Sequence, residues 1–345
     1  MVMNIVEAIK RVTGQHDLSV EDMVSVMTDI MTGNTTDAQN AAFLVGLQMK
    51  GIKVPEILGG VSVMRELSTK VVVDVNRSNL VDTCGTGGSG SNKFNVSTAS
   101  AFVAAAAGAK VAKHGNRGAS SKSGSADVLE AAGVNLDLTA TQIGEAILKV
   151  GVGFMFAPAH HSAMKHVITA RKQIGVRTVF NLLGPLTNPA GAPNQVIGVY
   201  SVDWIRPILE VLRELGSSHV LVVAAEDGLD EISNSSATTI GELQNGEISS
   251  FKVSPEEFGV DRINSHEVFQ VDSADASLAI LKKALTYELK PAGDIVALNA
   301  GAAIYAANLA DSLQGGVVKA KSLLTSGVAL ARLESLIQFS LEAGN

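Results

Sequence analysis

Cysteine and excess positive charge are both scarce in this chain of 345 residues. The one cysteine, Cys84, excludes an intramolecular disulfide framework and suits a reducing compartment. Basic side chains number 27 against 34 acidic ones, so the formal net charge is −7. That balance, with no basic run, argues against a general nucleic-acid-binding protein.

Long hydrophobic runs are missing as well. The longest apolar stretch, residues 99–112, is interrupted by Ser100, Gly108 and Lys110 and is too short to cross a bilayer. The first residues, MVMNIVEAIKR, lack the basic and apolar regions of a signal peptide. We therefore expect a soluble, cytoplasmic protein that binds neither membranes nor nucleic acid.

Hydrophobic residues, at 46%, and 33 glycines are what the chain has in quantity. The hydrophobic share excludes a disordered chain, and the length predicts about two domains. The first seventy residues have helical periodicity, with helices expected at 20–31, 36–50 and 55–68. Methionines recur on one face of the first of these helices, which makes that face either a partner-binding surface or, more commonly, ordinary core.

From residue 71 the pattern changes to alternating strands and helices. Strands are expected at 71–75, 80–83, 110–113, 153–156, 196–200 and 219–225, and helices at 96–107, 125–132, 158–174, 274–288 and from 293 onward. This alternation predicts right-handed crossovers and a mostly parallel central sheet. Asn245-Gly246 between two strand-like runs predicts an antiparallel hairpin with a type I′ turn. The expected fold class is α/β: a small all-helical domain plus a larger α/β domain.

A glycine-rich loop, Cys84-Gly85-Thr86-Gly87-Gly88-Ser89-Gly90, separates a predicted strand from a helix. Its backbone N–H groups, with the following helix N-terminus, suit an anion. The loop also fits the weak G-x-G-x-x-G dinucleotide pattern, but no acid lies between Asp82 and Asp127 to hold a ribose. We favour a phosphate site over a turn without a ligand.

Two further polar segments stand at the start of the next predicted helix and at the end of the next predicted strand. Asn95, Ser97 and Thr98 either cap the helix at 96–107 or contact phosphate oxygens or a hard metal ion, and the two alternatives are equally supported. Residues 113–123, KHGNRGASSKS, place cations and hydroxyls after a buried strand with no acid among them. In an acidic chain this favours a polyphosphate ligand over a solvated basic loop.

Carboxylates follow the strand at 219–225. Glu226 and Asp227 fit an acidic surface turn, whereas Asp230 and Glu231 suit Mg²⁺, which prefers oxygen ligands and bridges to substrate phosphates. The histidines at 160, 161 and 166 have neither zinc spacing nor a carboxylate, so we expect them to line a surface or pocket. Arg171 either binds a carboxylate or is a surface charge.

Together these motifs resemble those of the anthranilate phosphoribosyltransferases. In order they are CGTGGSG, NVSTAS, KHGNRGASSKSGSAD, FAPAHH, RTVFNLLGPLTNPA and DGLDEIS, and they cover essentially the whole chain. KHGNR and GPLTNP are more specific than the glycine loop. The resemblance implies an enzyme of tryptophan biosynthesis that transfers the phosphoribosyl group of phosphoribosyl pyrophosphate (PRPP) to the amine of anthranilate, with Mg²⁺, and releases pyrophosphate.

The resemblance also implies a homodimer formed through a helical domain of residues 1–70, rejoined by about 165–185, with residues 71–345 as the α/β domain. The implied Mg²⁺ ligands are Ser97, Asp230 and Glu231. The implied anthranilate-binding residues are Gly85, Asn116 and Arg171, with Pro185 nearby. The implied catalytic residues are Lys113 and His114. The implied PRPP-binding residues are Gly85, Gly88, Ser89, Lys93, Asn95, Val96, Ser97, Thr98, Lys113, His114, Gly115, Asn116, Arg117, Gly118, Ala119, Ser120 and Ser121.

The implied chemistry needs charge and positioning rather than a covalent nucleophile. Breaking the C1–pyrophosphate bond builds negative charge that Mg²⁺, Lys113 and loop N–H groups can stabilise. Arg171 and Asn116 would hold the anthranilate carboxylate so that the amine faces C1. The aromatic amine is neutral at pH 7, so no strong base is required, and we expect Cys84 to be structural.

Two residues depart from the family pattern. Ser89 replaces the acid of the usual GTGGDG, and Lys93 stands where a small hydroxylic residue is common. We hypothesise that Lys93 contacts a phosphate and weakens the need for a second metal ion. The runner-up function is a pyrimidine nucleoside phosphorylase of the same fold, which would not need the DGLDE carboxylates. A nucleic-acid-binding paralogue without activity is disfavoured by the net charge.

Overall fold

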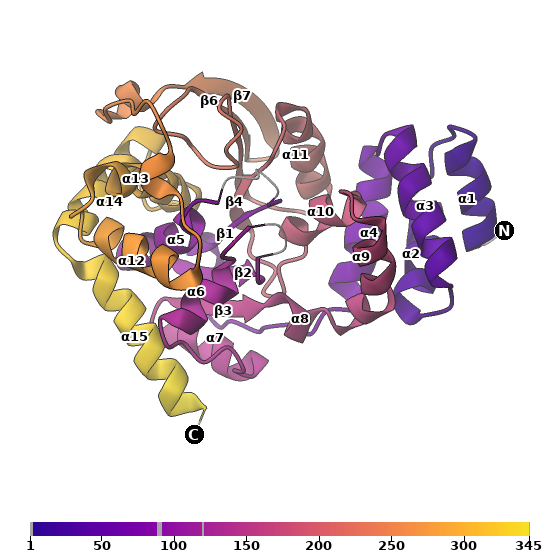
Figure 1. The fold of residues 1–345 in the computed structure, drawn as a ribbon, viewed down its shortest axis with the longest axis horizontal. Coiled ribbons are helices and arrows are strands. Elements are labelled where there is room, and N and C mark those ends of the chain that lie inside the picture. Colours follow the sequence, from indigo (N-terminus) through magenta and orange to yellow (C-terminus); the bar gives the residue numbers. More distant parts are fainter. Residues whose placement is uncertain (1–2, 88–91, 119–120, 345) are drawn as a thin grey trace.

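The computed structural model describes residues 3–87, 92–118 and 121–344. Figure 1 shows the N-terminal helices at one end of the molecule and a twisted sheet, flanked by helices, forming the rest. The predicted fold class, a small helical domain plus a larger α/β domain, is confirmed. Across the described residues, we find no helix that is both long and apolar enough to span a membrane.

The four N-terminal helices are α1 (Ile5–Thr13), α2 (Val20–Thr32), α3 (Asp37–Lys50) and α4 (Val54–Glu66). Capping boxes, Ser19 with Asp22 and Thr36 with Gln39, begin α2 and α3 by satisfying N–H groups that a helix start leaves unpaired. The α2 methionines are all buried, so that face is core.

The sheet has seven strands in the order β3-β2-β1-β4-β5-β6-β7. The strands are β1 (Leu80–Gly85), β2 (Lys110–Gly115), β3 (Val152–Phe156), β4 (Asn194–Gly198), β5 (His219–Ala225), β6 (Thr238–Gln244) and β7 (Glu247–Val253). The first five are parallel, as predicted. The hairpin of β6 and β7 is antiparallel, and its turn residues Asn245 and Gly246 have the positive φ angles, 53° and 80°, of a type I′ turn.

Helices cover both faces of the sheet. The remaining helices are α5 (Val96–Ala106), α6 (Ser125–Ala131), α7 (Ala140–Lys149), α8 (Ala157–His160), α9 (Ile168–Ile174), α10 (Val179–Leu183), α11 (Ile205–Glu214), α12 (Ala274–Leu285), α13 (Lys290–Ala306), α14 (Leu313–Thr325) and α15 (Val328–Ala343). The largest core lies between the sheet and the layer of α5 and α12–α15. α11 packs on β5 and β6 and also contacts α4, which joins the helical domain to the other face.

Two sequence predictions were wrong. Residues 71–75 do not form a strand: Val71 and Val73 are buried as their alternation requires, but the Val71 N–H donates to the Pro189 carbonyl, 3.1 Å away, instead of entering a ladder. The single helix expected at 158–174 is broken into α8, a 3₁₀ turn at Ser162–His166 and α9. The His160 carbonyl accepts the Thr69 N–H (2.8 Å), so a tertiary contact uses a group that a continuous helix would need.

The segment after this break lies against the helical domain. α9 packs on α3, and α10 packs on α4 and α3, an arrangement that Figure 1 shows at the junction of the two parts. Residues of α10 share one hydrophobic core with α2, α3 and α4. The division of the chain at residue 70, with residues 165–185 returning, stays a prediction.

Candidate active site

The polar motifs meet at the carboxyl edge of the parallel strands. The glycine loop follows β1, the KHGNR segment ends β2, and the acidic loop follows β5, while the sheet order places β1 beside both β2 and β4. The chain order reverses between β1 and β4, and open α/β sheets bind ligands at such switch points. The sheet topology therefore brings together motifs that are up to 140 residues or so apart in the chain.

Lys93 lies directly against the acidic pair. Its Nζ is 3.1 Å from Asp230 Oδ1 and 2.8 Å from Glu231 Oε2. The three side chains are 8%, 10% and 12% exposed, so the cluster is almost fully buried. The predicted metal carboxylates are therefore adjacent, and both point at one position that holds a cation.

One ammonium does not balance two carboxylates, and the pKa values reflect this. Burial, followed by the charge of Asp230, raises the pKa of Glu231 to about 8. Burial opposes the charge on Lys93, but Glu231 and Asp230 outweigh it and the pKa of Lys93 is raised. Burial also opposes the charge on Asp230, yet Lys93 keeps the pKa of Asp230 below its usual value. The two carboxylates are therefore favoured in their charged forms together only when more positive charge than one ammonium is nearby.

The acidic loop is held by two residues that the sequence reasoning missed. Asn299 on α13 accepts the Ile232 N–H (2.9 Å) and donates to the Ile232 carbonyl (2.9 Å). Gly198, at the end of β4, lets the loop approach, because a Cβ there would overlap the Asp230 carbonyl. A Cβ at Gly85 would lie 3.0 Å from Asp230 Oδ2. An asparagine inside an otherwise apolar helix was the signal available for Asn299.

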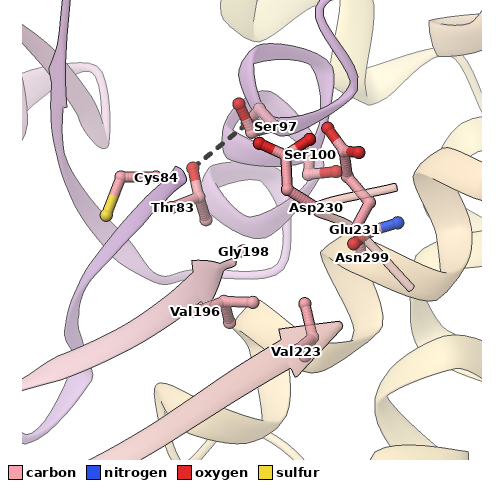
Figure 2. Close-up of a pocket in the computed structure, with 10 residues that line it drawn as sticks. All are labelled: Thr83, Cys84, Ser97, Ser100, Val196, Gly198, Val223, Asp230, Glu231 and Asn299. Atoms are coloured by element: carbon pink, nitrogen blue, oxygen red, sulfur yellow. Dashed lines mark hydrogen bonds between the residues drawn. The ribbon is translucent and has the colours of Figure 1, made fainter. Parts of the chain in front are cut away.

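A small cavity lies beside the acidic pair. Its volume is about 20 Å³, enough for one water molecule or ion, and its lining includes Ser97, Asp230, Glu231 and Thr83. Figure 2 shows Ser97 and the two acidic side chains on the same side of this space. Thr83 Oγ1 donates to the Ser97 carbonyl (3.1 Å), which fixes the start of α5 against β1. The three predicted metal ligands therefore border one space.

Lys113 is buried beneath Ser97. It is 3% exposed, and its Nζ donates to the Thr83 carbonyl (2.5 Å) and to Ser97 Oγ (3.3 Å). Burial lowers the pKa of Lys113, and Asp82 partly offsets this. Asp82 accepts hydrogen bonds from Asn188 Nδ2 (2.7 Å) and the His114 N–H (3.2 Å), although burial raises its pKa. Asp82 and Asn188 were not predicted as site residues; an acid inside an apolar strand was the signal.

Asn95 and Arg117 have partners within the fold. Asn95 Oδ1 accepts from Ser277 Oγ (2.7 Å) and Ser123 Oγ (2.9 Å), so it ties the start of α5 to the loop before α6. Val96 and Thr98 behind it are buried. The Arg117 guanidinium pairs with Asp127 (3.0 Å) and Glu130 (2.7 Å) on α6. Its side chain is thus directed to α6.

His114 is a neutral, buried imidazole. Burial, followed by the charge of His161, lowers the pKa of His114 to about 3, and the two ring centroids are 5.2 Å apart. A group with that pKa is a weak base at neutral pH. Cys84 donates through Sγ to the Pro185 carbonyl (3.8 Å), and burial raises the pKa of its thiol, which fits the structural role expected for it.

Arg171 lies on the helical side of the molecule. Its guanidinium stacks on the Phe180 ring at 5.0 Å, and burial lowers its pKa. In the described part of the chain no carboxylate pairs with Arg171, and no hydrogen bond joins it to Asn116 or Gly85. Asn116 Oδ1 accepts the Arg117 N–H (2.8 Å). The structure therefore does not join the three predicted anthranilate residues directly to one another.

The structure does not describe all of the predicted PRPP-binding residues. Gly88, Ser89, Ala119 and Ser120 lie outside the described residues. Of the neighbouring positions that are described, Gly115 is the last residue of β2, and Gly118 and Ser121 lie between β2 and α6.

The donor set fits Mg²⁺. Two carboxylates already converge on one cation, and a serine hydroxyl borders the same space. Over residues 3–87, 92–118 and 121–344, no group of three or more His, Cys, Asp or Glu side chains is placed to hold a metal. A pair of carboxylates suits Mg²⁺, which takes its other ligands from water and substrate phosphates.

Known protein families match both parts of this chain. Residues 77–330 match the "Glycosyl transferase family, a/b domain" and residues 6–68 match the "Glycosyl transferase family, helical bundle domain". The anthranilate phosphoribosyltransferase of Hahella chejuensis is 56% identical over 342 residues, covering 98% of each chain.

Solved structures show the same fold. The anthranilate phosphoribosyltransferase of Thermus thermophilus has a TM-score of 0.90 at 41% identity, covering 97% of this chain and 99% of that one. The Saccharomyces cerevisiae enzyme, solved with PRPP and Mg, has a TM-score of 0.87 at 26% identity, covering 98% of each chain. It has also been solved with 4-fluoroanthranilate. This chain therefore belongs to the anthranilate phosphoribosyltransferase family.

Proposed function

We propose that this protein transfers the phosphoribosyl group of PRPP to the amine of anthranilate, in tryptophan biosynthesis in the cytoplasm, with Mg²⁺ as cofactor. The observation that carries the proposal is the convergence of Asp230, Glu231 and Ser97 on one space at the carboxyl edge of the sheet. The glycine loop and the KHGNR segment end at the same edge. That combination suits a substrate with a diphosphate.

Asp230, Glu231 and Ser97 would hold the metal. When bound there, Mg²⁺ supplies charge that stabilises the oxygens of the leaving pyrophosphate. Lys113 supports the same region from beneath: its Nζ holds Ser97 Oγ, so it orients that hydroxyl and adds positive potential. Lys113 is in this sense a positioning residue, because its ammonium is buried.

PRPP would bind along the loop edge. The proposed contacts are Gly85, Gly88, Ser89, Lys93, Asn95, Val96, Ser97, Thr98, Lys113, His114, Gly115, Asn116, Arg117, Gly118, Ala119, Ser120 and Ser121. Asn95 acts by fixing the loop at 121–124 relative to α5, and Arg117 acts through its backbone, since its guanidinium is paired with α6.

Anthranilate would bind between that edge and the helical domain. Gly85, Asn116 and Arg171 are the proposed contacts, and the Arg171 guanidinium, stacked on Phe180, has no carboxylate partner among the described residues. A substrate carboxylate would supply that partner. Placing the amine opposite C1 is then catalysis by positioning.

In the reaction, the amine lone pair forms the N–C1 bond while the C1–O bond to pyrophosphate breaks. The electron pair of that bond leaves with pyrophosphate, and the nitrogen afterwards loses one proton. Because the amine attacks in its neutral form, no strong base is needed beforehand, which agrees with the low pKa of His114, about 3, caused by burial. His114 would therefore line the acceptor site as a neutral group.

We also propose a homodimer formed by the helical domain. Val6 and Met49, which are 49% and 77% exposed, leave apolar surface on α1 and α3. Sedimentation analysis of the wild-type protein and of Met49→Glu tests this: the variant should shift toward the monomer.

The function is tested by the fluorescence of anthranilate. Adding PRPP and MgCl₂ to enzyme and anthranilate should remove the fluorescence, and omitting PRPP or adding EDTA should prevent the loss. No loss at high enzyme concentration, together with phosphorolysis of a pyrimidine nucleoside, would favour the runner-up activity.

A further inference from the structure

Lys93 occupies the position toward which both metal carboxylates point. Its Nζ is within 3.1 Å of Asp230 Oδ1 and 2.8 Å of Glu231 Oε2, in a cluster where no side chain is more than 12% exposed. A Mg²⁺ ion bound to the same two oxygens would lie about 2.0–2.1 Å from each. An ammonium and a metal ion cannot both occupy that position.

The backbone around Lys93 is fixed, so the ammonium does not reach this position by chance. Residue 93 forms an isolated antiparallel bridge with Gln270. On either side of it, the Phe94 N–H donates to the Phe269 carbonyl (2.9 Å) and the Val271 N–H donates to the Asn92 carbonyl (2.7 Å). The segment at 269–271 therefore holds Lys93 beside the acidic loop.

The other buried lysine of the site does not share this role. Lys113 Nζ donates to the Thr83 carbonyl and to Ser97 Oγ, on the β1 and α5 side of the cavity. Figure 2 shows Thr83 and Ser97 joined there and the acidic pair lying next to them. Lys93 is thus the lysine whose ion pairs are with the carboxylates themselves.

We propose that the Lys93 ammonium is a built-in competitor of Mg²⁺: it occupies the position between the Asp230 and Glu231 carboxylates in the free protein, and the metal binds there only by displacing it. The proposal rests on the proposed function, because it takes this pair as the Mg²⁺ site. In this proposal the Lys93 side chain sets how tightly and when the metal binds.

The competition has a consequence for the order of binding. Free Mg²⁺ must displace the Lys93 ammonium before it can bind the two carboxylates. Mg²⁺ that arrives with a diphosphate brings further oxygen ligands, which offset the loss of the lysine contact. The wild-type protein should therefore bind free Mg²⁺ weakly and Mg²⁺-pyrophosphate more tightly.

Isothermal titration with MgCl₂ alone, in the absence of substrate, tests the proposal. Lys93→Met removes the competitor, and we expect it to bind Mg²⁺ at least about tenfold more tightly than the wild type. Lys50→Met, which removes a buried lysine of the helical domain, is the matched control and should bind like the wild type. Lys93→Arg keeps the cation and should also stay weak.

Melting temperatures give a second readout that does not depend on activity. Without metal, Lys93→Met leaves two neighbouring carboxylates without their cation and should melt lower than the wild type; MgCl₂ should raise its melting temperature more than that of the wild type. If Lys93→Met does not fold, Lys93→Gln, which keeps a hydrogen-bond donor, takes its place in both measurements.

Equal Mg²⁺ affinity in the wild type and the neutral variants would overturn the proposal. Adding Asp230→Asn to Lys93→Met separates the two ideas. If affinity is unchanged by Lys93→Met but Asp230→Asn abolishes transfer, Lys93 is no competitor while the metal site stands. If Lys93→Met tightens binding and Asp230→Asn does not weaken it again, the pair is not the metal site and both ideas fail.

Discussion

Each half of the molecule buries a lysine against carboxylate, and the two clusters are built differently. In the helical domain, Lys50 Nζ lies 3.0 Å from Glu56 Oε1, with side chains 2% and 0% exposed, and 2.7 Å from Oδ1 of the exposed Asp17. The Glu56 carboxylate also accepts the N–H groups of Leu18 (3.0 Å) and Lys53 (2.8 Å). Both of its oxygens are therefore used by the fold, and the cluster ties the start of α2 to the start of α4.

In the α/β domain, one lysine faces two buried carboxylates beside a cavity, at the edge where the parallel strands end. Burial, followed by the charge of Asp230, raises the pKa of Glu231 to about 8, so one ammonium does not hold both carboxylates in their charged forms. The two clusters show how a structural ion pair differs from a ligand-binding one. A buried ion pair whose oxygens are saturated by backbone N–H groups stabilises the fold, whereas an unbalanced pair at strand ends is available to a ligand.

The largest effect is expected from a substitution in the cluster of Lys93, Asp230 and Glu231. Asp230→Asn should lower kcat/KM for phosphoribosyl transfer by about 10²–10³-fold, because a metal ligand and its charge are lost. Steady-state rates at several Mg²⁺ concentrations measure this. The folded state should remain, as judged by circular dichroism; a rate within twofold or so of the wild type would show that the pair does not serve the reaction.

A substitution in the Lys50–Glu56 cluster should lower the free energy of unfolding instead. Glu56→Ala removes the buried carboxylate partner of Lys50, which keeps only the exposed Asp17, and leaves two N–H groups without an acceptor. It should lower the free energy of unfolding by about 3–5 kcal/mol. Urea denaturation measures it. The rate per folded molecule should be unchanged at low temperature; a large loss of rate in a folded variant would contradict the purely structural role.

Asn299 in the α/β domain and Asn40 in the helical domain are both buried, so substituting each of them compares the two domains directly. Asn299→Leu removes both hydrogen bonds to Ile232 and should cost about 2 kcal/mol of stability, while raising the Mg²⁺ concentration for half-maximal activity about tenfold. Asn40→Leu in the helical domain removes bonds to Thr35 and His166 and should cost a similar amount, about 2 kcal/mol. Only the first should alter the Mg²⁺ dependence. Equal effects of the two on that dependence would mean that Asn299 does not position the acidic loop.

The effect that is smallest at neutral pH is a pH dependence of stability. Burial lowers the pKa of His114 to about 3 and of His161 to about 4, so both imidazoles stay neutral in the folded chain and bind protons in the unfolded one below about 6.5. Stability is therefore full above that pH and falls as pH drops from about 6.5 toward 4, by up to about 1.4 kcal/mol per pH unit for each group.

His161→Gln should flatten this slope, and His16→Gln, at an exposed position of the helical domain, should leave it unchanged. Urea denaturation at a series of pH values measures both. A slope that His161→Gln does not reduce would show that the burial of this imidazole does not cost stability on acidification.

Local signals explain how much of the fold was predictable. The strand at His219–Ala225 and the hairpin at Asn245-Gly246 have strong patterns and lie where they were predicted. The break at His160 has no glycine behind it and depends on a hydrogen bond from Thr69, far away in the chain. The alternation at residues 71–75 is real, but only the fold decides that no neighbouring strand pairs with it.

In the candidate site, too, the features with a local sequence signal were predicted and those that depend on tertiary contacts were not. Motifs at strand ends predicted the acidic pair, the cationic segment and their common edge, because parallel strands end at one side of a sheet. Lys93 and Asp230 are 137 residues apart in the sequence, and no local sequence pattern predicts that their side chains are in contact. Asn299 and Gly198 act through contacts with the loop, which become visible only when α13 and β4 are in place.

The central claim, that the cluster in the α/β domain serves a metal-dependent phosphoribosyl transfer, is tested most directly by measuring anthranilate consumed and pyrophosphate released in one reaction while Mg²⁺ is titrated. The account predicts one pyrophosphate for each anthranilate, with both rates falling to background when the metal is removed by EDTA. Consumption of anthranilate without pyrophosphate release, or at full rate in EDTA, would contradict it.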